Sequence, residues 1–280
     1  MISVIIPAHN ESAVIARTLR SITDGAQPGE LDIVVVCNGC TDHTADIARS
    51  VKPGVRVIET AIASKTHALN LGDAAAFAFP RIYADADVVI TVDAIRILAN
   101  QLESSNLLAV APTPKFDLAG CSWPVRACYH VRSLLPSAYE GIGGSGVYAL
   151  SEAGRRRFGR FPEVIADDGY VRIQFQLEER ETLRSISSTV FPPRTVKDLI
   201  AQKTRAHYGS FELESRFPSR WEHRGKSNNT SLIQLFKSPG LWASLFVYSF
   251  VTIVARHQAR KRLNTKSLRW DRDDTSRANA

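Results

Sequence analysis

The chain has 280 residues, of which 44% are hydrophobic and 22% are charged, so it can bury a core and extensive disorder is not expected. Its formal net charge is +7, which favours an acidic partner such as a nucleotide diphosphate, a lipid phosphate, an anionic membrane or a nucleic acid. The four cysteines do not form a disulfide scaffold in a chain of this length. Because only Cys37 and Cys40 form a close pair, a four-thiolate zinc site is disfavoured.

The first 115 residues alternate the patterns of strands and helices. We expect strands over 2–8, 31–37, 55–60, 81–90 and 107–114, and helices over 12–22, 44–51, 66–78 and 95–102. Ser12 is the candidate N-cap of the first helix. Continuously apolar strands that alternate with helices predict an α/β, Rossmann-like fold, with a mostly parallel sheet covered by helices on both faces.

From about residue 116 to 230 the rhythm changes. Glycines gather in GIGGSGVYAL (141–150), an acidic pair follows at Asp167 and Asp168, and 191–209 runs into a basic helix. We interpret this stretch as a second half of the same domain and not as an independent one.

The segment 239–255 carries no charge, and basic residues flank it on both sides. Counted from Leu241, it offers 15 apolar or small residues, fewer than the roughly 20 that span a bilayer. A spanning helix would also export the basic tail, against the positive-inside tendency. We therefore expect an interfacial or re-entrant helix that contacts a membrane surface through 239–262, with a buried core helix as the alternative. The apolar run 2–8 lacks a basic leader and does not resemble a signal peptide, so we expect the protein at the cytoplasmic face of the cell membrane.

Polar clusters fall where the predicted strands end, at His9-Asn10-Glu11, Asn38-Gly39 and Asp85-Ala86-Asp87. In open parallel sheets, ligands bind beyond the carboxyl ends of the strands. Two carboxylates one residue apart can hold a hard divalent cation, with substrate phosphates completing its shell. Asp85 and Asp87 are therefore candidate metal ligands, and an acidic surface turn is the alternative.

An ordered series of segments resembles glycosyltransferase family 2: VIIPAHNE (4–11), VVVCNGCTDHTADIA (34–48), SKTHALNLG (64–72) and YADADV (83–88). The later segments GIGGSGVYAL, ADDGY and QKTRAHYG resemble the acceptor half of that family, so the resemblance covers about 2–210. It implies a GT-A fold and an inverting transfer of sugar from a UDP- or GDP-sugar, with Mn²⁺ or Mg²⁺ as cofactor. Together with the apolar segment and basic tail, it leads us to expect a nucleotide-sugar-binding half (1–115), an acceptor-binding half (116–230), and a membrane-associated helix with a basic tail (231–280).

The resemblance assigns donor-binding roles to residues at the strand ends. Asn38 stands where many members carry an aspartate that binds uracil, which leaves the base open because an amide both donates and accepts. Asp42 has a helix N-cap as its equal alternative, and Lys65, near the base or diphosphate, could instead be an exposed lysine at a helix start. Asp85 would contact the ribose and Asp87 the metal. The nucleoside pocket would be lined by Pro7, Ala8, Asn10 and Glu11.

The resemblance also implies the catalytic groups. Asp168 would be the base that takes the proton of the acceptor hydroxyl, with Asp167 supporting it, unless the pair merely caps a helix. Arg205 would bind the diphosphate. Because Ala206 and His207 follow it where processive members have a tryptophan, polymer synthesis is disfavoured. The backbone beneath the sugar or acceptor would be Gly141, Gly143, Gly144 and Gly146, with an ordinary tight turn as the alternative.

Two other functions are compatible with parts of the sequence. A sugar nucleotidylyltransferase would need a glycine-rich, basic loop after the first strand, where this chain has PAHNESAV. A catalytically degenerate, membrane-peripheral scaffold would not need its acidic positions. We find no nucleic-acid recognition motif, so nucleic acid is not an expected partner. The expected acceptor is a glycan or a lipid-linked molecule of the cell envelope.

Overall fold

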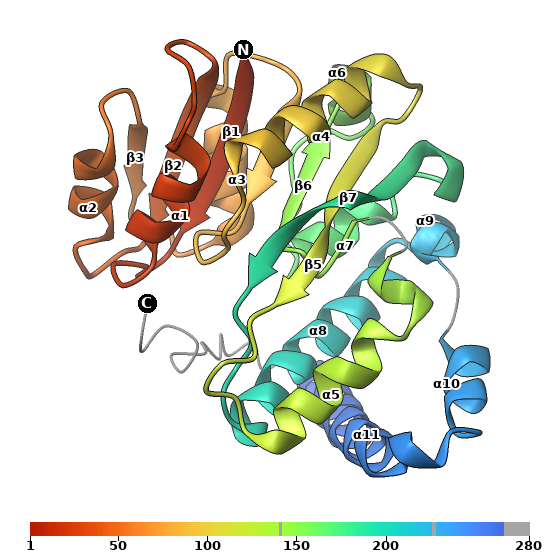
Figure 1. Ribbon diagram of the computed structural model, residues 1–280. Helices are drawn as coiled ribbons and strands as arrows, with labels where there is room; N and C mark the ends of the chain where they lie inside the picture. Colours follow the sequence, from red (N-terminus) through yellow and green to blue (C-terminus); the bar gives the residue numbers. More distant parts are fainter. Residues whose placement is uncertain (140–141, 226–227, 266–280) are drawn as a thin grey trace.

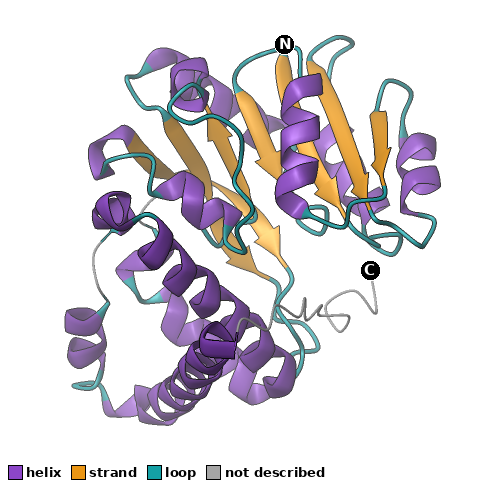
Figure 2. Ribbon diagram, turned by 180° about the vertical axis from the view of Figure 1, so that it is seen from behind, coloured by secondary structure: helices purple, strands orange, loops and turns teal. Residues whose placement is uncertain are grey.

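The computed structural model describes residues 1–139, 142–225 and 228–265. Gly141 and the end of the predicted basic tail, 266–280, lie outside the described residues. Seven strands form one mixed sheet of order β3-β2-β1-β4-β6-β5-β7, with helices on both of its faces (Figures 1 and 2). The predicted α/β fold with a mostly parallel sheet is therefore confirmed.

The first half of the chain supplies five strands and four helices. They are β1 (Ile2–Ala8), α1 (Ile15–Thr23), β2 (Leu31–Asn38), α2 (Thr44–Val51), β3 (Arg56–Thr60), α3 (Lys65–Ala75), β4 (Arg81–Ala84), α4 (Val92–Ser104) and β5 (Ala109–Phe116). Every element predicted within 1–115 is present. The predicted boundary between 115 and 116 falls at the end of β5.

The second half completes the sheet and adds a helical layer. Its principal elements are α5 (Trp123–Ser133), β6 (Val147–Leu150), α6 (Glu152–Arg155), α7 (Asp167–Arg172), β7 (Arg180–Val190), α8 (Val196–Arg216), α9 (Pro218–Trp221), α10 (Asn229–Leu235) and α11 (Trp242–Thr265). β6 runs antiparallel between β4 and β5, while β5 pairs with β7 in parallel. One sheet thus extends through both halves of the chain.

Three predicted boundaries were wrong. The strand predicted over 81–90 ends at Ala84, because the chain then turns and the Val88 N–H donates to Asp85 O at 3.5 Å. The helix predicted over 66–78 ends at Ala75. Ser12 is not the N-cap of α1, which begins after Val14; the Ser12 N–H instead donates to Asp42 Oδ2 at 3.1 Å.

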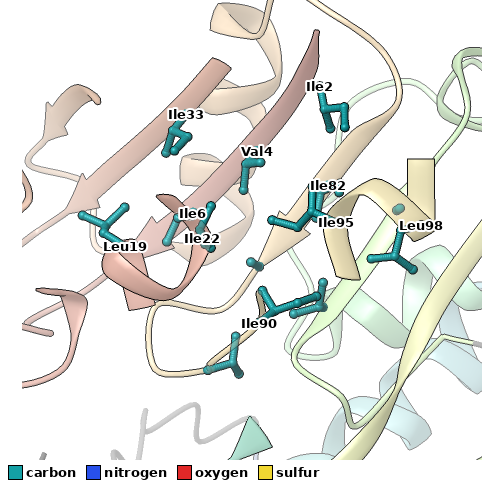
Figure 3. Close-up of a cluster of buried hydrophobic side chains, with 14 of the residues drawn as sticks. Ile2, Val4, Ile6, Leu19, Ile22, Ile33, Ile82, Ile90, Ile95 and Leu98 are labelled. Atoms are coloured by element: carbon teal, nitrogen blue, oxygen red, sulfur yellow. The ribbon is translucent and has the colours of Figure 1, made fainter. Parts of the chain in front are cut away.

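The main core lies between the sheet and the helices α1 and α4 (Figure 3). All seven residues of β1 are buried, as expected for a central strand covered on both faces. Ile15, Leu19 and Ile22 of α1 recur at helical spacing and are fully buried against it. Each such side chain contributes about 1.5–3 kcal/mol when removed from water. This packing fixes the strand ends from which the site is built.

A buried ion network on the other face of the sheet joins α3, β4 and α6. Asp73 accepts from Arg81 Nη1 at 2.5 Å, from Arg155 Nε at 2.8 Å and from Tyr83 Oη at 2.6 Å. Burial alone would raise the pKa of Asp73, but these donors and charges lower it below its ordinary value. One carboxylate therefore compensates two poorly solvated guanidinium groups.

We expect Asp73→Asn to reduce the free energy of unfolding by about 3 kcal/mol, because it leaves two buried cations without a counter-charge. Urea denaturation of both proteins measures the difference. Asp46→Asn is the matched control, since Asp46 forms only solvent-exposed pairs and should change stability by less than about 0.5 kcal/mol. Equal effects of the two substitutions would contradict the role assigned to the network.

The helix α11 has two unlike faces. Leu245, Val251, Ala255 and Ala259 are fully buried, and Val251 packs with residues of α5 and α8. The opposite face exposes Trp242, Phe246, Phe250 and Ile253. By length and composition alone, Pro239–Leu263 is able to cross a membrane. One face of α11 packs against α5 and α8 along the helix, so α11 is part of the helical layer of the domain (Figure 1).

Candidate active site

A cavity of about 590 Å³ lies at the carboxyl ends of the strands, between the sheet and the helices α5, α7 and α8. The predicted site residues that line it are Pro7, Glu11, Asn38, Lys65, Asp85, Asp87, Gly144, Asp167, Asp168 and Arg205. Residues from both halves of the chain thus meet in one cavity, as expected at the ends of parallel strands.

Ala8, Asn10 and Asp42 do not line the cavity, although donor contacts were predicted for them. Asn10 Oδ1 accepts from Thr41 N at 2.7 Å, and Ala8 O accepts from Asn38 Nδ2 at 2.8 Å. Asp42 accepts from Ser12 N and Thr44 N, both at 3.1 Å. The polar groups of all three residues are used to hold the loops that follow β1 and β2, so we assign them to loop architecture.

Asn38 and His9 shape the nucleoside end of the cavity. Because Ala8 O can only accept, the amide nitrogen of Asn38 must face it, which leaves Oδ1 as an acceptor. His9 Nδ1 lies 2.5 Å from Asn38 O, so Nδ1 carries a hydrogen and donates it to this carbonyl. Glu11 is buried beside them, and its carbonyl oxygen accepts from the first amides of α1. This end therefore presents acceptors that suit the N–H groups of a base or the hydroxyls of a ribose.

Lys65 lies at the centre of the site and is not the exposed lysine of the alternative interpretation. Its Nζ is 2.7 Å from Asp85 Oδ1 and 3.0 Å from Asp167 Oδ1. Burial would lower the pKa of Lys65, but the charges of Asp167, Asp85 and Asp168 raise it above its ordinary value. The ammonium group therefore stays protonated and joins the end of β4 to the start of α7.

The acidic pair of α7 is divided by its surroundings. Asp167 is buried, and this burial raises its pKa to about 6 in spite of the opposing charge of Lys65. Asp168 is more accessible; its Oδ1 accepts from Gly169 N at 2.7 Å, and its Oδ2 lies beside Gly143, 3.7 Å from where a Cβ at that position would stand. Of the two carboxylates, Asp167 is thus engaged by Lys65, whereas Asp168 is the one able to meet an incoming group.

A glycine loop closes the floor between the acidic residues and α5. Gly143, Gly144 and Gly146 all have positive φ. A Cβ at position 144 would lie 2.1 Å from Arg132 Nη2, and one at position 146 would lie 2.4 Å from Val88 Cγ1. Glycine is therefore favoured here both by the backbone conformation and by close packing. Without side chains in this loop, residues from the end of β4, from α5 and from α7 can approach one another at the cavity.

Asp85 and Asp87 form the only acidic pair at the end of β4. Among the described residues no group of three His, Cys, Asp or Glu side chains is arranged to hold a metal. Two carboxylates suit Mg²⁺ or Mn²⁺ when phosphate oxygens and waters supply the remaining ligands. The donor set thus fits a cation that binds together with a diphosphate, and it does not fit a protein-only metal cage.

The opposite end of the cavity is cationic, and sequence reasoning missed most of it. Arg132 of α5 and Lys203 of α8 line it beside Arg205 and His207. Arg132 stacks on Phe116 at 5.1 Å, and Lys203 Nζ lies 4.8 Å from the Tyr248 ring centroid. Burial, and then the nearby charge of Arg132, lower the pKa of Lys203 to about 8. Burial also lowers the pKa of His207, to about 4, so His207 is neutral near pH 7.

The lowered pKa of Lys203 means that its charge destabilises the free protein. This destabilisation is fully present below about pH 8, where the lysine is protonated in both the folded and the unfolded protein. It disappears above pH 10.5, the ordinary pKa of lysine, where both forms are neutral. We expect Lys203→Met to increase the free energy of unfolding by about 1–3 kcal/mol at pH 7, with a smaller gain at pH 10. Urea denaturation at both values tests this. The exposed Lys197 of the same helix provides the control Lys197→Met, and an equal gain in both variants would refute the assignment.

Comparison with known proteins identifies relatives of the chain. Residues 3–134 match the family described as "Glycosyl transferase family 2". The 4,4'-diaponeurosporenoate glycosyltransferase of Staphylococcus aureus strain USA300 is 34% identical over 121 residues, which is 40% of this chain. The matched segment spans only 31% of the length of that relative.

Solved structures resemble nearly the whole chain. A mannosyltransferase from Pyrobaculum calidifontis, in complex with GDP-Man and Mn²⁺, has a TM-score of 0.67 at 18% identity, covering 95% of this chain and 88% of its own. Glucosyl-3-phosphoglycerate synthase of Mycobacterium tuberculosis has a TM-score of 0.56 at 20% identity, with 79% and 80% covered. TarS of S. aureus, in complex with UDP, has a TM-score of 0.54 at 14% identity, with 98% and 94% covered. The expected GT-A fold is confirmed by these likenesses.

Proposed function

Because residues 3–134 match glycosyltransferase family 2 and the chain has the GT-A fold, we propose that the protein is a member of this family that transfers a sugar from a UDP- or GDP-sugar to an acceptor hydroxyl with inversion. The observation that carries this proposal is the meeting of Lys65, Asp85 and Asp167 in one cavity, with Asp87 and Asp168 beside them. The solved relatives support the donor class, since they hold GDP-Man or UDP.

The donor is proposed to occupy the cavity from the nucleoside end to the acidic centre. Asn38, His9 and Glu11 would bind the base and ribose, and Asp85 would reach the ribose as well. Asp87, with Asp85, would hold Mn²⁺ or Mg²⁺ against the diphosphate, where the bound ion neutralises charge on the leaving group. Arg205 lines the same cavity, and its guanidinium would bind diphosphate oxygens.

The chemical step is a single displacement. The acceptor oxygen bonds to the anomeric carbon, the bond from that carbon to the diphosphate oxygen breaks, and the acceptor proton passes to Asp168. Lys65 contacts both Asp167 and Asp85, so it would hold these two carboxylates in position during the step. The products are the glycosylated acceptor and a nucleoside diphosphate.

Two substitutions separate donor binding from chemistry. We expect Asp87→Ala to abolish the Mn²⁺-dependent part of nucleoside diphosphate binding, because a cation ligand is lost. We expect Asp168→Asn to bind the diphosphate normally but to lower the turnover number at least 100-fold, because an amide cannot accept the proton. Calorimetry with UDP and GDP, with and without Mn²⁺, measures the first effect, and donor-sugar hydrolysis or transfer measures the second.

Near-normal turnover of the Asp168→Asn variant would show that Asp168 is not the catalytic base. If the folded wild-type protein binds neither UDP nor GDP and hydrolyses no donor, the proposal fails and the degenerate scaffold replaces it.

We also propose that α11 rests on the cytoplasmic face of the cell membrane, which agrees with an acceptor that is lipid-linked or part of the envelope. Its exposed residues Trp242, Phe246, Phe250 and Ile253 follow one another at intervals of four, four and three, so they share one helical face. Basic side chains follow at Arg256, Arg260, Lys261 and Arg262. An apolar stripe with neighbouring cations is typical of helices that lie in an anionic interface.

The double substitution Phe246→Ser/Phe250→Ser should lower binding to vesicles at least tenfold, because two aromatic side chains no longer enter the interface. Co-sedimentation with phosphatidylcholine vesicles, with and without phosphatidylglycerol, measures the binding. Ile97→Ser is the control, since Ile97 is an exposed apolar residue on the distant α4. Unchanged sedimentation of the double variant would exclude α11 as the docking surface.

A further inference from the structure

The cationic end of the cavity holds two positive side chains that no carboxylate in the described part of the chain neutralises. Within 1–139, 142–225 and 228–265, neither Arg132 nor Lys203 forms an ion pair with an acidic residue. Both are partly buried and line the cavity. Two like charges in a poorly solvated site lose hydration and repel one another, which destabilises the folded protein. They become favourable once an anion enters between them.

Aromatic rings hold these cations in place without neutralising them. The Arg132 guanidinium lies 5.1 Å from the Phe116 ring centroid and 5.8 Å from that of Tyr129, and Lys203 Nζ lies over Tyr248. Tyr129 is itself fixed by a hydrogen bond of 3.1 Å to Gln202 Oε1. Cation–π contacts orient a charge and leave its hydrogens available. The side chains are therefore arranged before a ligand arrives.

The pair lies apart from the proposed nucleoside and cation sites. The nucleoside end is built from β1 and β2, and the proposed cation ligands follow β4, whereas Arg132 and Lys203 come from α5 and α8, the helical layer that also carries Arg205 (Figure 1). Arg132 packs against Gly144, and Asp168 faces the neighbouring Gly143. A ligand on Arg132 and Lys203 would thus lie next to the proposed base, on the acceptor side of the glycine loop.

We propose that Arg132 and Lys203 form a phosphate-binding subsite for the acceptor, which is therefore a phosphate-bearing alcohol whose hydroxyl reaches Asp168. This inference rests on the proposed transferase function. A forked guanidinium together with a point-charge ammonium matches the oxygens and the charge of a phosphate better than those of a neutral glycan. The phosphate source is either a soluble phosphate ester or a phospholipid headgroup, which bind through the same chemistry.

The test uses glycerol 3-phosphate as the soluble probe, titrated calorimetrically into the full chain loaded with Mn²⁺ and the nucleoside diphosphate that it binds. The wild-type protein should bind the probe, Arg132→Gln and Lys203→Met should each weaken binding about tenfold, and the double variant should bind none. Nucleoside diphosphate affinity should stay within about twofold in all variants, which also shows that they fold. Lys197→Met should behave as wild type.

A second arm identifies the source of the phosphate. Phosphatidylcholine vesicles with phosphatidylglycerol replace glycerol 3-phosphate, and the same variants are compared. A tenfold loss on vesicles, with weak binding of the soluble ester, would assign the subsite to a lipid headgroup; the converse would assign it to a soluble acceptor. Both results support phosphate recognition.

Three outcomes would overturn the inference. Wild-type protein that binds neither probe has no such subsite, and variants that bind both probes normally do not contain its ligands. If Arg132→Gln and Lys203→Met also lose affinity for the nucleoside diphosphate, the two cations bind the donor diphosphate and not the acceptor. Failure of the proposed function is distinguishable, because it appears as absent nucleoside diphosphate binding in the wild type, and the probes can still be titrated into the unloaded chain.

Discussion

The arrangement of the site depends on one ammonium group that compensates several carboxylates. Asp85 follows β4, whereas Asp167 and Asp168 begin α7, and these carboxylates would repel one another around a shared cavity. Lys65 lies within 3.0 Å of the first two, and in a poorly solvated environment such attractions are stronger than at a surface. The start of α3, the end of β4 and the start of α7 are thereby held at one point. Asp168 takes its place near the proposed reacting centre because Asp167 is already engaged.

The cavity is electrostatically polarised along its length. Neutral and acidic acceptors lie at the strand ends, carboxylates balanced by Lys65 lie in the middle, and unneutralised cations lie among the helices of the second half. A donor whose diphosphate arrives with a divalent cation suits the middle, and an anion suits the far end. The glycine loop separates these regions because it places backbone where side chains would fill the space.

Much of the nucleotide half was predictable because each of its elements has a local signal. The strands β1 and β2 are mostly apolar and buried along nearly their whole length, as burial on both faces requires. The short β6 has only four residues and pairs antiparallel, so no pattern announces its place in the sheet. The sequence motifs did not show which of their polar residues reach the cavity. Glu11 and Asn38 line it, whereas the side-chain oxygens of Asn10 and Asp42 accept hydrogen bonds from nearby backbone N–H groups.

The cationic end shows why sequence alone was insufficient. Within α5, Arg126 and Arg132 are chemically identical, yet Arg126 Nε donates to Cys121 O and Arg132 faces the cavity. The difference arises from α8 and from Gly144, which are distant in the chain. Lys203 is likewise one of several lysines and arginines in its region, and its aromatic partner Tyr248 comes from α11. Such placements are properties of tertiary packing.

The place of β6 in the sheet sets the order in which the molecule can be assembled during synthesis. Strands β1 to β4 can associate once residue 84 has been made, but β5 and β7 join them only through β6, which comes later in the chain than both β4 and β5. Pairings between distant segments form slowly, and unpaired strand edges are exposed until they do. The insertion of β6 also fixes the adjoining loop 142–146 beneath the cavity. A nascent chain therefore carries an open edge at β4 until β6 inserts, and the same insertion fixes one wall of the cavity before β7 pairs with β5.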